Sequence, residues 1–217
     1  MAGLWTRLTW SRAAFVLLLL NVVWTASLFI APFTIPPGSF ANEVGGANMM
    51  DHGDIWVTLP PYAAIVYAFG DIQCHQLWHR SYWLNGNQMP IDARMTSMYI
   101  FANLGLLAAM LASPALSTGQ VMLNAFPASI RSRLQRLGAE RAGALIVVLG
   151  LLPIAVDGFT QLFGWRESTN ELRVITGAPG GFVGGLLVGA MLMSIRQITR
   201  DIREMRARAA VPASRPR

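Results

Sequence analysis

Long apolar runs alternate with shorter polar segments along this chain. Four of these runs approach the ~20 residues that a helix needs to cross the hydrocarbon core of a bilayer. They cover residues 13–33, 96–114, 142–163 and 174–195. The pattern predicts an all-α fold, a polytopic bundle of transmembrane helices, with residues 13–33 as the first membrane helix.

A fifth apolar run is shorter and begins at Pro60-Pro61. Proline is tolerated in the first turn of a helix, where its missing N–H had no partner. We expect this helix to continue through polar residues to about His79. It crosses the membrane only if its polar end lies in a wet or protein-lined cavity, and it is re-entrant otherwise. The sequence thus predicts four to five membrane helices.

Two basic segments have an amphipathic pattern. The segment PASIRSRLQRLG, residues 127–138, places its large apolar residues on one helical face and arginines opposite, and the tail after Ile195 repeats this arrangement. Such segments are typical of helices that lie in the membrane interface. We therefore expect interfacial amphipathic helices in addition to the membrane helices.

Composition agrees with a lipid environment. Charged residues make up 13% of the chain and apolar residues 53%, whereas soluble domains carry about 25% charged residues. All 17 basic residues are arginine, and seven of them follow the last apolar run. The positive-inside rule explains this clustering, so the net charge of +6 does not indicate nucleic-acid binding.

The arginine clusters also predict the topology. One cluster lies in residues 131–141, and the other is the tail, residues 196–217. Two crossings separate them, so both can be cytoplasmic. The polar segments 71–95 and 164–173 are then both extracytoplasmic. The side of the N-terminus stays open, because it depends on whether the Pro60 helix crosses.

The first polar segment contains residue types that bind metals. Asp71, His75 and His79 are spaced four apart, which would place them on one helical face beside Cys74. Carboxylate, imidazole and thiolate can hold a divalent metal such as zinc. The alternative is that these residues form a hydrogen-bonded helix end at the membrane surface.

The second polar cluster surrounds Asp157, near the end of an apolar run. An ionisable group at that depth is costly and is usually paired. The candidate polar site consists of Arg80, Arg94, Asp157, Gln161, Arg166, Asn170 and Arg173. Either it is a buried ion pair that fixes helix register, or Asp157 lines a cavity. Ser168 followed by Glu171 is a capping box, so we expect Ser168 to start the last helix.

Glycines recur every fourth residue in the last apolar run, at Gly177, Gly181, Gly185 and Gly189. Overlapping GxxxG steps form a groove in which another helix can approach closely. Packing within the same bundle is the favoured interpretation, and a dimer face is the alternative.

Two stretches together resemble a known family. CHQ, RS, NG, QMP and AR, followed by DGFTQLFGWRESTNELRVITG, are similar to prokaryotic membrane proteins catalogued as domain of unknown function two-thousand-eighty-five. The resemblance covers residues 60–195 and implies a multi-helix membrane fold with both motifs in one site. Family members resemble PxCARCTG where this chain has PIDARMTS. Asp92 and Met95 thus replace a CxxC pair, although Asp92 remains a possible metal ligand.

Three functional hypotheses follow. The first is a structural or accessory subunit of a larger membrane complex, with a degenerate extracytoplasmic polar site. The second is a metal-dependent enzyme or redox protein with a divalent metal at Asp71, Cys74, His75, His79 and Asp92. The third is a small transporter that uses Asp157. We expect one multi-pass domain in the plasma membrane, residues 1–217, that contacts lipid and either other membrane subunits or a second copy of itself.

Overall fold

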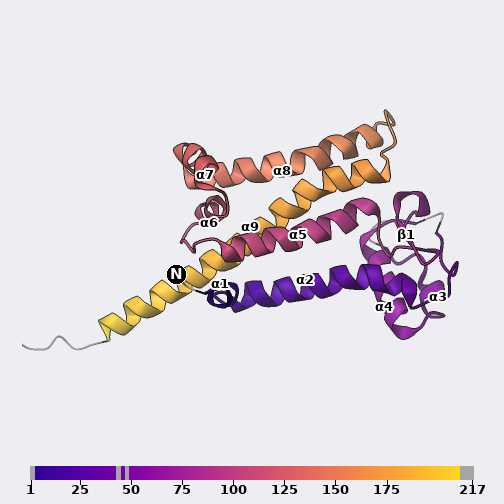
Figure 1. Cartoon of the computed structure of the whole chain (residues 1–217), viewed down its shortest axis with the longest axis horizontal. Coiled ribbons are helices and arrows are strands. Elements are labelled where there is room, and N and C mark those ends of the chain that lie inside the picture. Colours follow the sequence, from indigo (N-terminus) through magenta and orange to yellow (C-terminus); the bar gives the residue numbers. More distant parts are fainter. Residues whose placement is uncertain (1–2, 43–44, 47–48, 211–217) are drawn as a thin grey trace, which may run out of the picture.

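A computed structural model describes residues 3–42, 45–46 and 49–210. In this part of the chain, four helices are long and apolar enough to cross a membrane (Figure 1). They are α2 (Arg12–Ile30, continued by a 3₁₀ turn at Ala31–Phe33), α5 (Ala93–Leu111), α8 (Ala139–Leu162) and α9 (Asn170–Ala209). The predicted helical membrane fold is confirmed, with four candidate crossings.

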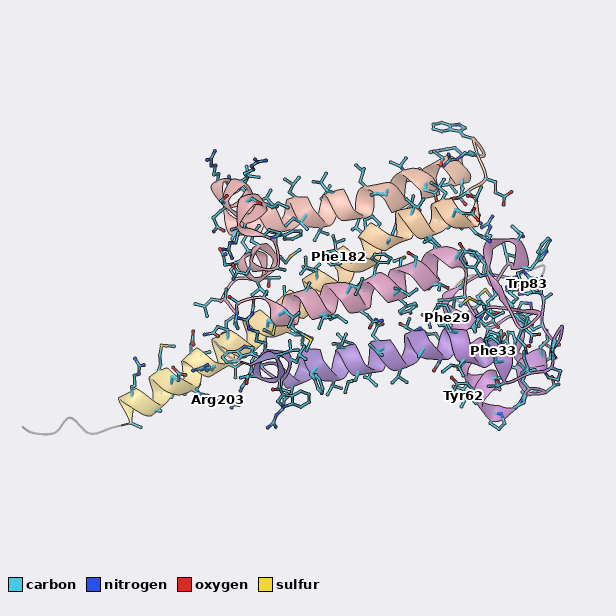
Figure 2. All side chains as sticks on the ribbon, viewed as in Figure 1. Phe29, Phe33, Tyr62, Trp83, Phe182 and Arg203 are labelled. Atoms are coloured by element: carbon cyan, nitrogen blue, oxygen red, sulfur yellow. The ribbon has the colours of Figure 1, made fainter. Side chains whose placement is uncertain are left out.

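The four long helices are arranged in a row. α5 and α9 pack along each other, α2 lies against α5, and α8 lies against α9 (Figure 1). Side chains project outward from both edges of this row (Figure 2). Leu20 and Val23 of α2 and Val148 and Leu149 of α8 are all more than half exposed. Such surfaces are stable in lipid and costly in water.

The glycine ladder is the seam between α5 and α9. A Cβ at Gly177 would lie 2.7 Å from the Arg94 carbonyl oxygen, and one at Gly181 would lie 2.6 Å from the Met98 Cα. A Cβ at Gly185 would meet the backbone of Ala102, and one at Gly189 would lie 2.7 Å from the Ala109 Cβ. In the structure the ladder therefore packs inside this bundle, against α5. Backbones approach closely because no side chain separates them.

One end of the row carries the basic segments. α1 (Leu4–Leu8), α6 (Thr118–Asn124), α7 (Ala128–Leu134) and a 3₁₀ turn at Gln135–Leu137 lie there, and the tail extends beyond them (Figure 1). The helix predicted in residues 127–138 is present as α7. The tail does not form a separate interfacial helix, because α9 continues without a break to Ala209. Residues 211–217 lie outside the described part.

The opposite end carries a small cap between α2 and α5. It contains α3 (Gly53–Trp56), α4 (Pro61–Gln73), a 3₁₀ turn at Trp78–Arg80 and a hairpin of β1 (Trp83–Leu84) and β2 (Asn87–Gln88). The hairpin turns through Asn85 and Gly86, which both have positive φ, 51° and 69°. This geometry is that of an Asn-Gly type I′ turn.

The prediction that the Pro60 helix reaches His79 is wrong. α4 ends at Gln73, Cys74 is extended (φ −139°, ψ 148°), and Gln76 has a φ of +47°. Its 13 residues extend about 20 Å, too short to cross. The chain turns away there, and the side-chain amide of Gln76 holds the turn by donating to the main-chain carbonyls of Tyr67 (2.9 Å) and Pro90 (2.8 Å).

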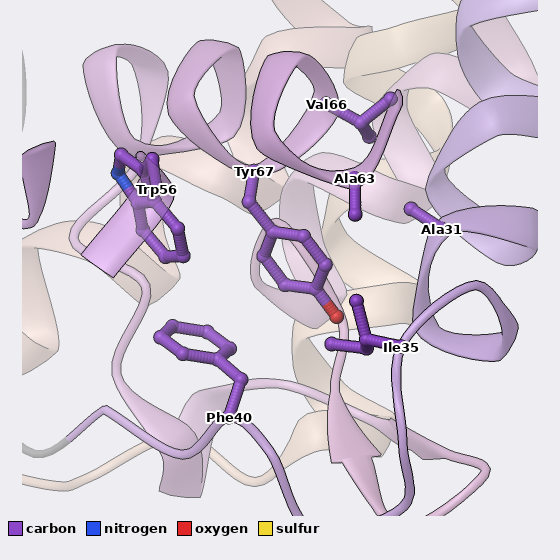
Figure 3. Close-up of a cluster of buried hydrophobic side chains, with 7 residues drawn as sticks. All are labelled: Ala31, Ile35, Phe40, Trp56, Ala63, Val66 and Tyr67. Carbon is purple, nitrogen blue, oxygen red and sulfur yellow. The ribbon is translucent and has the colours of Figure 1, made fainter. Parts of the chain in front are cut away.

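An aromatic core stabilises the cap. Tyr67 stacks on Trp56 at 5.5 Å between ring centroids, and Phe40 packs edge-on against both rings (Figure 3). Ala31 and Ile35, which follow α2, complete the cluster. The core therefore joins the end of a membrane helix to α4, so the cap is fixed to the bundle.

Buried amides of the first motif connect the cap loops. Asn87 accepts from the amides of Ser39 (2.8 Å) and Phe40 (3.2 Å). Gln88 accepts from the Asn42 amide (2.8 Å) and donates to the Gln76 carbonyl. All three side chains, Gln76, Asn87 and Gln88, are fully buried. Buried amides need such partners, which gives these motif residues a structural role.

Candidate functional site

Asp157 is the centre of a buried polar cluster at the capped end. Its carboxylate, 2% exposed, forms ion pairs with Arg94 and with Arg166 at 3.5 Å. The hydroxyls of Ser168 (3.0 Å) and Thr176 (3.4 Å) also donate to it. Two guanidinium groups and two hydroxyls compensate for the loss of water around this carboxylate. Of the two interpretations of Asp157, the geometry supports the ion pair that fixes helix register.

The cluster joins three membrane helices. Asp157 is in the last turns of α8, Arg94 is in the first turn of α5, and Thr176 is in the second turn of α9. The predicted capping role of Ser168 is wrong, because the N-cap of α9 is Thr169, whose hydroxyl accepts from the Leu172 amide at 3.3 Å. Ser168 is buried instead and bonds Asp157.

Arg173 forms a second layer beside Asp157. Its residue exposure is 2%, and its guanidinium donates to Asn170 (3.1 Å) and Gln161 (3.3 Å). Both partners are neutral amides, and Arg173 makes no ion pair with any described residue. A buried guanidinium is ordinarily matched by a carboxylate or another anion, so this charge is incompletely compensated.

The two sequence motifs meet at this cluster. Glu167 lies 3.5 Å from His79 Nε2 and 3.6 Å from the Arg80 guanidinium, and Asn170 donates to the Ser81 carbonyl at 3.4 Å. An open cavity of about 320 Å³ lies between the motifs. It is lined by Arg80, Gln161, Gly164, Arg166 and Glu167. All seven residues of the candidate polar site therefore belong to the cluster or its cavity.

The metal-ligand candidates do not share a helical face. Asp71 accepts from the Trp56 indole (2.8 Å) and the His52 amide (3.1 Å), inside the cap. His75 instead contacts the Gly45 carbonyl at 3.0 Å, and His79 contacts Glu167. The four-residue spacing does not align these side chains, because α4 ends before both histidines. Within the described residues, no three His, Cys, Asp or Glu side chains converge.

Cys74 lies close to the positions of the missing CxxC. Its sulfur accepts from the Asp92 amide at 3.3 Å, and Met95 packs against the apolar cluster that contains Cys74. Asp92 also caps α5, since its carboxylate accepts from the Met95 amide at 2.7 Å. Burial, reinforced by the Asp92 charge, raises the pKa of the Cys74 thiol to about 12. The thiol is therefore protonated and unreactive near neutral pH.

Comparisons with known proteins agree with the membrane fold. The profile of a family described as "Predicted membrane protein (DUF2085)" matches residues 74–187, more than half of the chain. The chain belongs to this family. The match begins at Cys74 and includes both motifs of the polar cluster. This membrane protein therefore contacts lipid.

Two archaeal relatives are similar over much of their length. An uncharacterised protein of Methanocaldococcus jannaschii is 29% identical over 167 residues, 77% of this chain and 84% of the relative. An uncharacterised protein of Methanothermobacter thermautotrophicus is 32% identical over 108 residues, 50% of this chain and 77% of the relative. No solved structure matches the chain.

Four residues of the site were not identified from the sequence: Ser81, Glu167, Ser168 and Thr176. The signal for Thr176 was its spacing, since it lies three residues after Arg173 on the buried face of α9. The role of Ser168 was obscured by an apparent capping pattern. Ser81 uses its main-chain carbonyl, so its side-chain type carried no signal.

Proposed function

We propose that this chain is a non-catalytic accessory subunit of a larger membrane complex, whose bundle receives a helix of another membrane protein. The observation that supports this role is an apolar groove of about 300 Å³ on one face of the row. Asn21 of α2, Tyr99 and Ala102 of α5, and Gly180 and Gly184 of α9 line it.

The groove has the composition of a helix-docking surface. A Cβ at Gly184 would meet no described atom within 4 Å, whereas its neighbour Gly185 is packed against Ala102. Gly185 thus packs inside the bundle, and the preceding residue, Gly184, faces outward. Small residues at a membrane helix surface favour close approach of a second helix.

The polar cluster also favours a structural role. The carboxylate of Asp157 is fully occupied by neighbouring side chains, and the Cys74 thiol is buried and protonated. A catalytic acid, base or nucleophile needs access to a substrate and a suitable pKa. These groups instead hold α5, α8, α9 and the cap together.

The proposal also includes the orientation of the bundle in the membrane. We place the end with α6, α7 and the tail in the cytoplasm, because their arginines obey the positive-inside rule. The cap and the polar cluster then lie outside. With α2, α5, α8 and α9 as the four crossings, which their length and apolar composition support, the N-terminal segment is cytoplasmic as well.

Labelling with a membrane-impermeant maleimide tests this topology. The wild type should not react in intact cells, because its one cysteine, Cys74, is buried and its pKa is about 12. Val57→Cys, at a cap position that is 83% exposed, should react from outside. Arg203→Cys in the exposed tail should react only after permeabilisation. Reaction of both variants in intact cells would refute the assignment.

The substitution Gly184→Leu tests the docking role. It should fill the groove and dissociate the partner while the bundle itself stays folded, because position 184 has free space around it. Native electrophoresis of mild-detergent extracts should show the wild type in an assembly larger than its 23.7 kDa and the variant as a free subunit.

The matched control is Val188→Leu, one helical turn further along α9 at another exposed position, which should leave the assembly intact. A wild type that extracts as a monodisperse monomer contradicts the proposal. A homo-oligomer that Gly184→Leu disrupts would assign the groove to self-association and contradict the accessory role.

A further inference from the structure

The cavity beside Asp157 has an excess of positive charge. The guanidinium groups of Arg80 and Arg166 line it, and those of Arg94 and Arg173 lie in the adjoining cluster. The carboxylates near them are Asp92, Asp157 and Glu167. Four cations against three anions leave the cluster with one net positive charge.

Several guanidinium donors in the cluster have no partner. The Nε atoms of Arg80 and Arg94 are buried and make no hydrogen bond to the described residues. Arg173 is almost completely buried, and among the described residues its guanidinium bonds only the amide oxygens of Asn170 and Gln161. Unsatisfied buried donors cost free energy. An anion in the cavity would bring a compensating negative charge close to these groups, and Arg80 and Arg166 at its wall can bind phosphate with paired N–H donors.

Glu167 has the position of a removable counter-ion. It lies at the cavity wall, 3.6 Å from Arg80 and 3.5 Å from His79, but its side chain is 65% exposed. Pairs this long and this exposed contribute little stability. The carboxylate can therefore rotate into solvent and leave Arg80 and His79 to an incoming anion at little cost.

The cavity opens where lipid headgroups would lie. Phe163 stacks on Phe159 and on Trp165 at the end of α8, and all three rings are more than half exposed. Exposed aromatic side chains at a helix end mark the membrane–water interface. Gly164 and Arg166, which line the cavity, flank Trp165 in the sequence.

We propose that the cavity between Arg80 and Arg166 binds a phosphate group. The phosphate displaces Glu167, and the buried Arg173 adds its positive charge without lining the cavity. The ligand chemistry is a phosphate anion, carried by a lipid headgroup or by a soluble molecule. This binding site is separate from the helix groove and does not depend on a partner subunit.

Calorimetric titration of the full-length protein in a maltoside detergent tests the site. The probes are inorganic phosphate and short-chain phosphatidylglycerol, at constant ionic strength with chloride as the reference. At least one probe should bind. Arg80→Gln should weaken binding at least about tenfold, since it removes a charged hydrogen-bonding partner. Glu167→Gln should tighten it, because the competing carboxylate is lost.

The control is Arg203→Gln, which removes one arginine from the exposed tail and should leave the affinity unchanged. Tighter binding of phosphatidylglycerol than of inorganic phosphate assigns a lipid source, and the reverse assigns a soluble one. Absence of binding by both probes overturns the proposal. So does equal affinity in the wild type and Glu167→Gln, a variant at an exposed position that is expected to fold normally.

Discussion

Gly185→Leu is expected to abolish the folded bundle. A Cβ at this position would lie 2.8 Å from the Ala102 Cα and still closer to its carbonyl oxygen. Backbone atoms cannot rotate away as a side chain can, so α5 and α9 would have to separate. The cost should exceed the ~1–3 kcal/mol that is typical of overpacking, because this seam is the main contact between the long helices.

The neighbouring glycine provides the control for this experiment. Gly184→Leu introduces the same side chain one position away, where a Cβ meets no described atom within 4 Å. Thermal unfolding in detergent, followed by circular dichroism, should show a near-normal transition for Gly184→Leu and a lost or strongly lowered one for Gly185→Leu. Equal stability of both variants would mean that α5 and α9 do not pack as described.

Asp157→Asn should destabilise the protein by about 3–5 kcal/mol, the range for removing one partner of a buried ion pair. The amide keeps the shape of the carboxylate but not its charge. Arg94 and Arg166 would lose their shared anion, and Arg173 would be left beside an uncompensated Arg94. The loss should appear as a lower midpoint in denaturant or thermal unfolding.

A double substitution separates this effect from a simple packing defect. Arg94→Gln combined with Asp157→Asn should cost less than the sum of the two single changes, because the pair is removed together. Asp54→Asn, at an exposed position in α3, is the control and should be almost neutral. Additive losses would show that Arg94 and Asp157 are not coupled.

The membrane helices could be predicted because their signals are local. An apolar run of about 20 residues specifies a crossing by itself, and a glycine every fourth residue specifies a close contact. The partner of that contact was not predictable, because nothing in residues 177–189 indicates α5 rather than another chain. The end of the last helix was also missed, since polarity after Ile195 does not interrupt helical hydrogen bonding.

The cap and the site depend on long-range contacts, which could not be predicted from local sequence patterns. The four-residue spacing of Asp71, His75 and His79 is meaningful only on a continuous helix. That helix ends at Gln73, and Gln76 holds the turn by bonding the Pro90 carbonyl, 14 residues away. Asp157 was found because a carboxylate in an apolar run is conspicuous. Ser168 was misassigned because Thr169 caps equally well.

The length of α9 connects the capped end of the molecule to the tail through one helix. Its 40 residues extend about 60 Å, twice the thickness of the hydrocarbon core. Arg173 and Thr176 at one end belong to the buried cluster, and the arginines at the other end stand clear of the bundle (Figure 1). The tail and the Asp157 cluster are therefore joined by a single helix, which can bend where Pro179 removes a helical hydrogen bond.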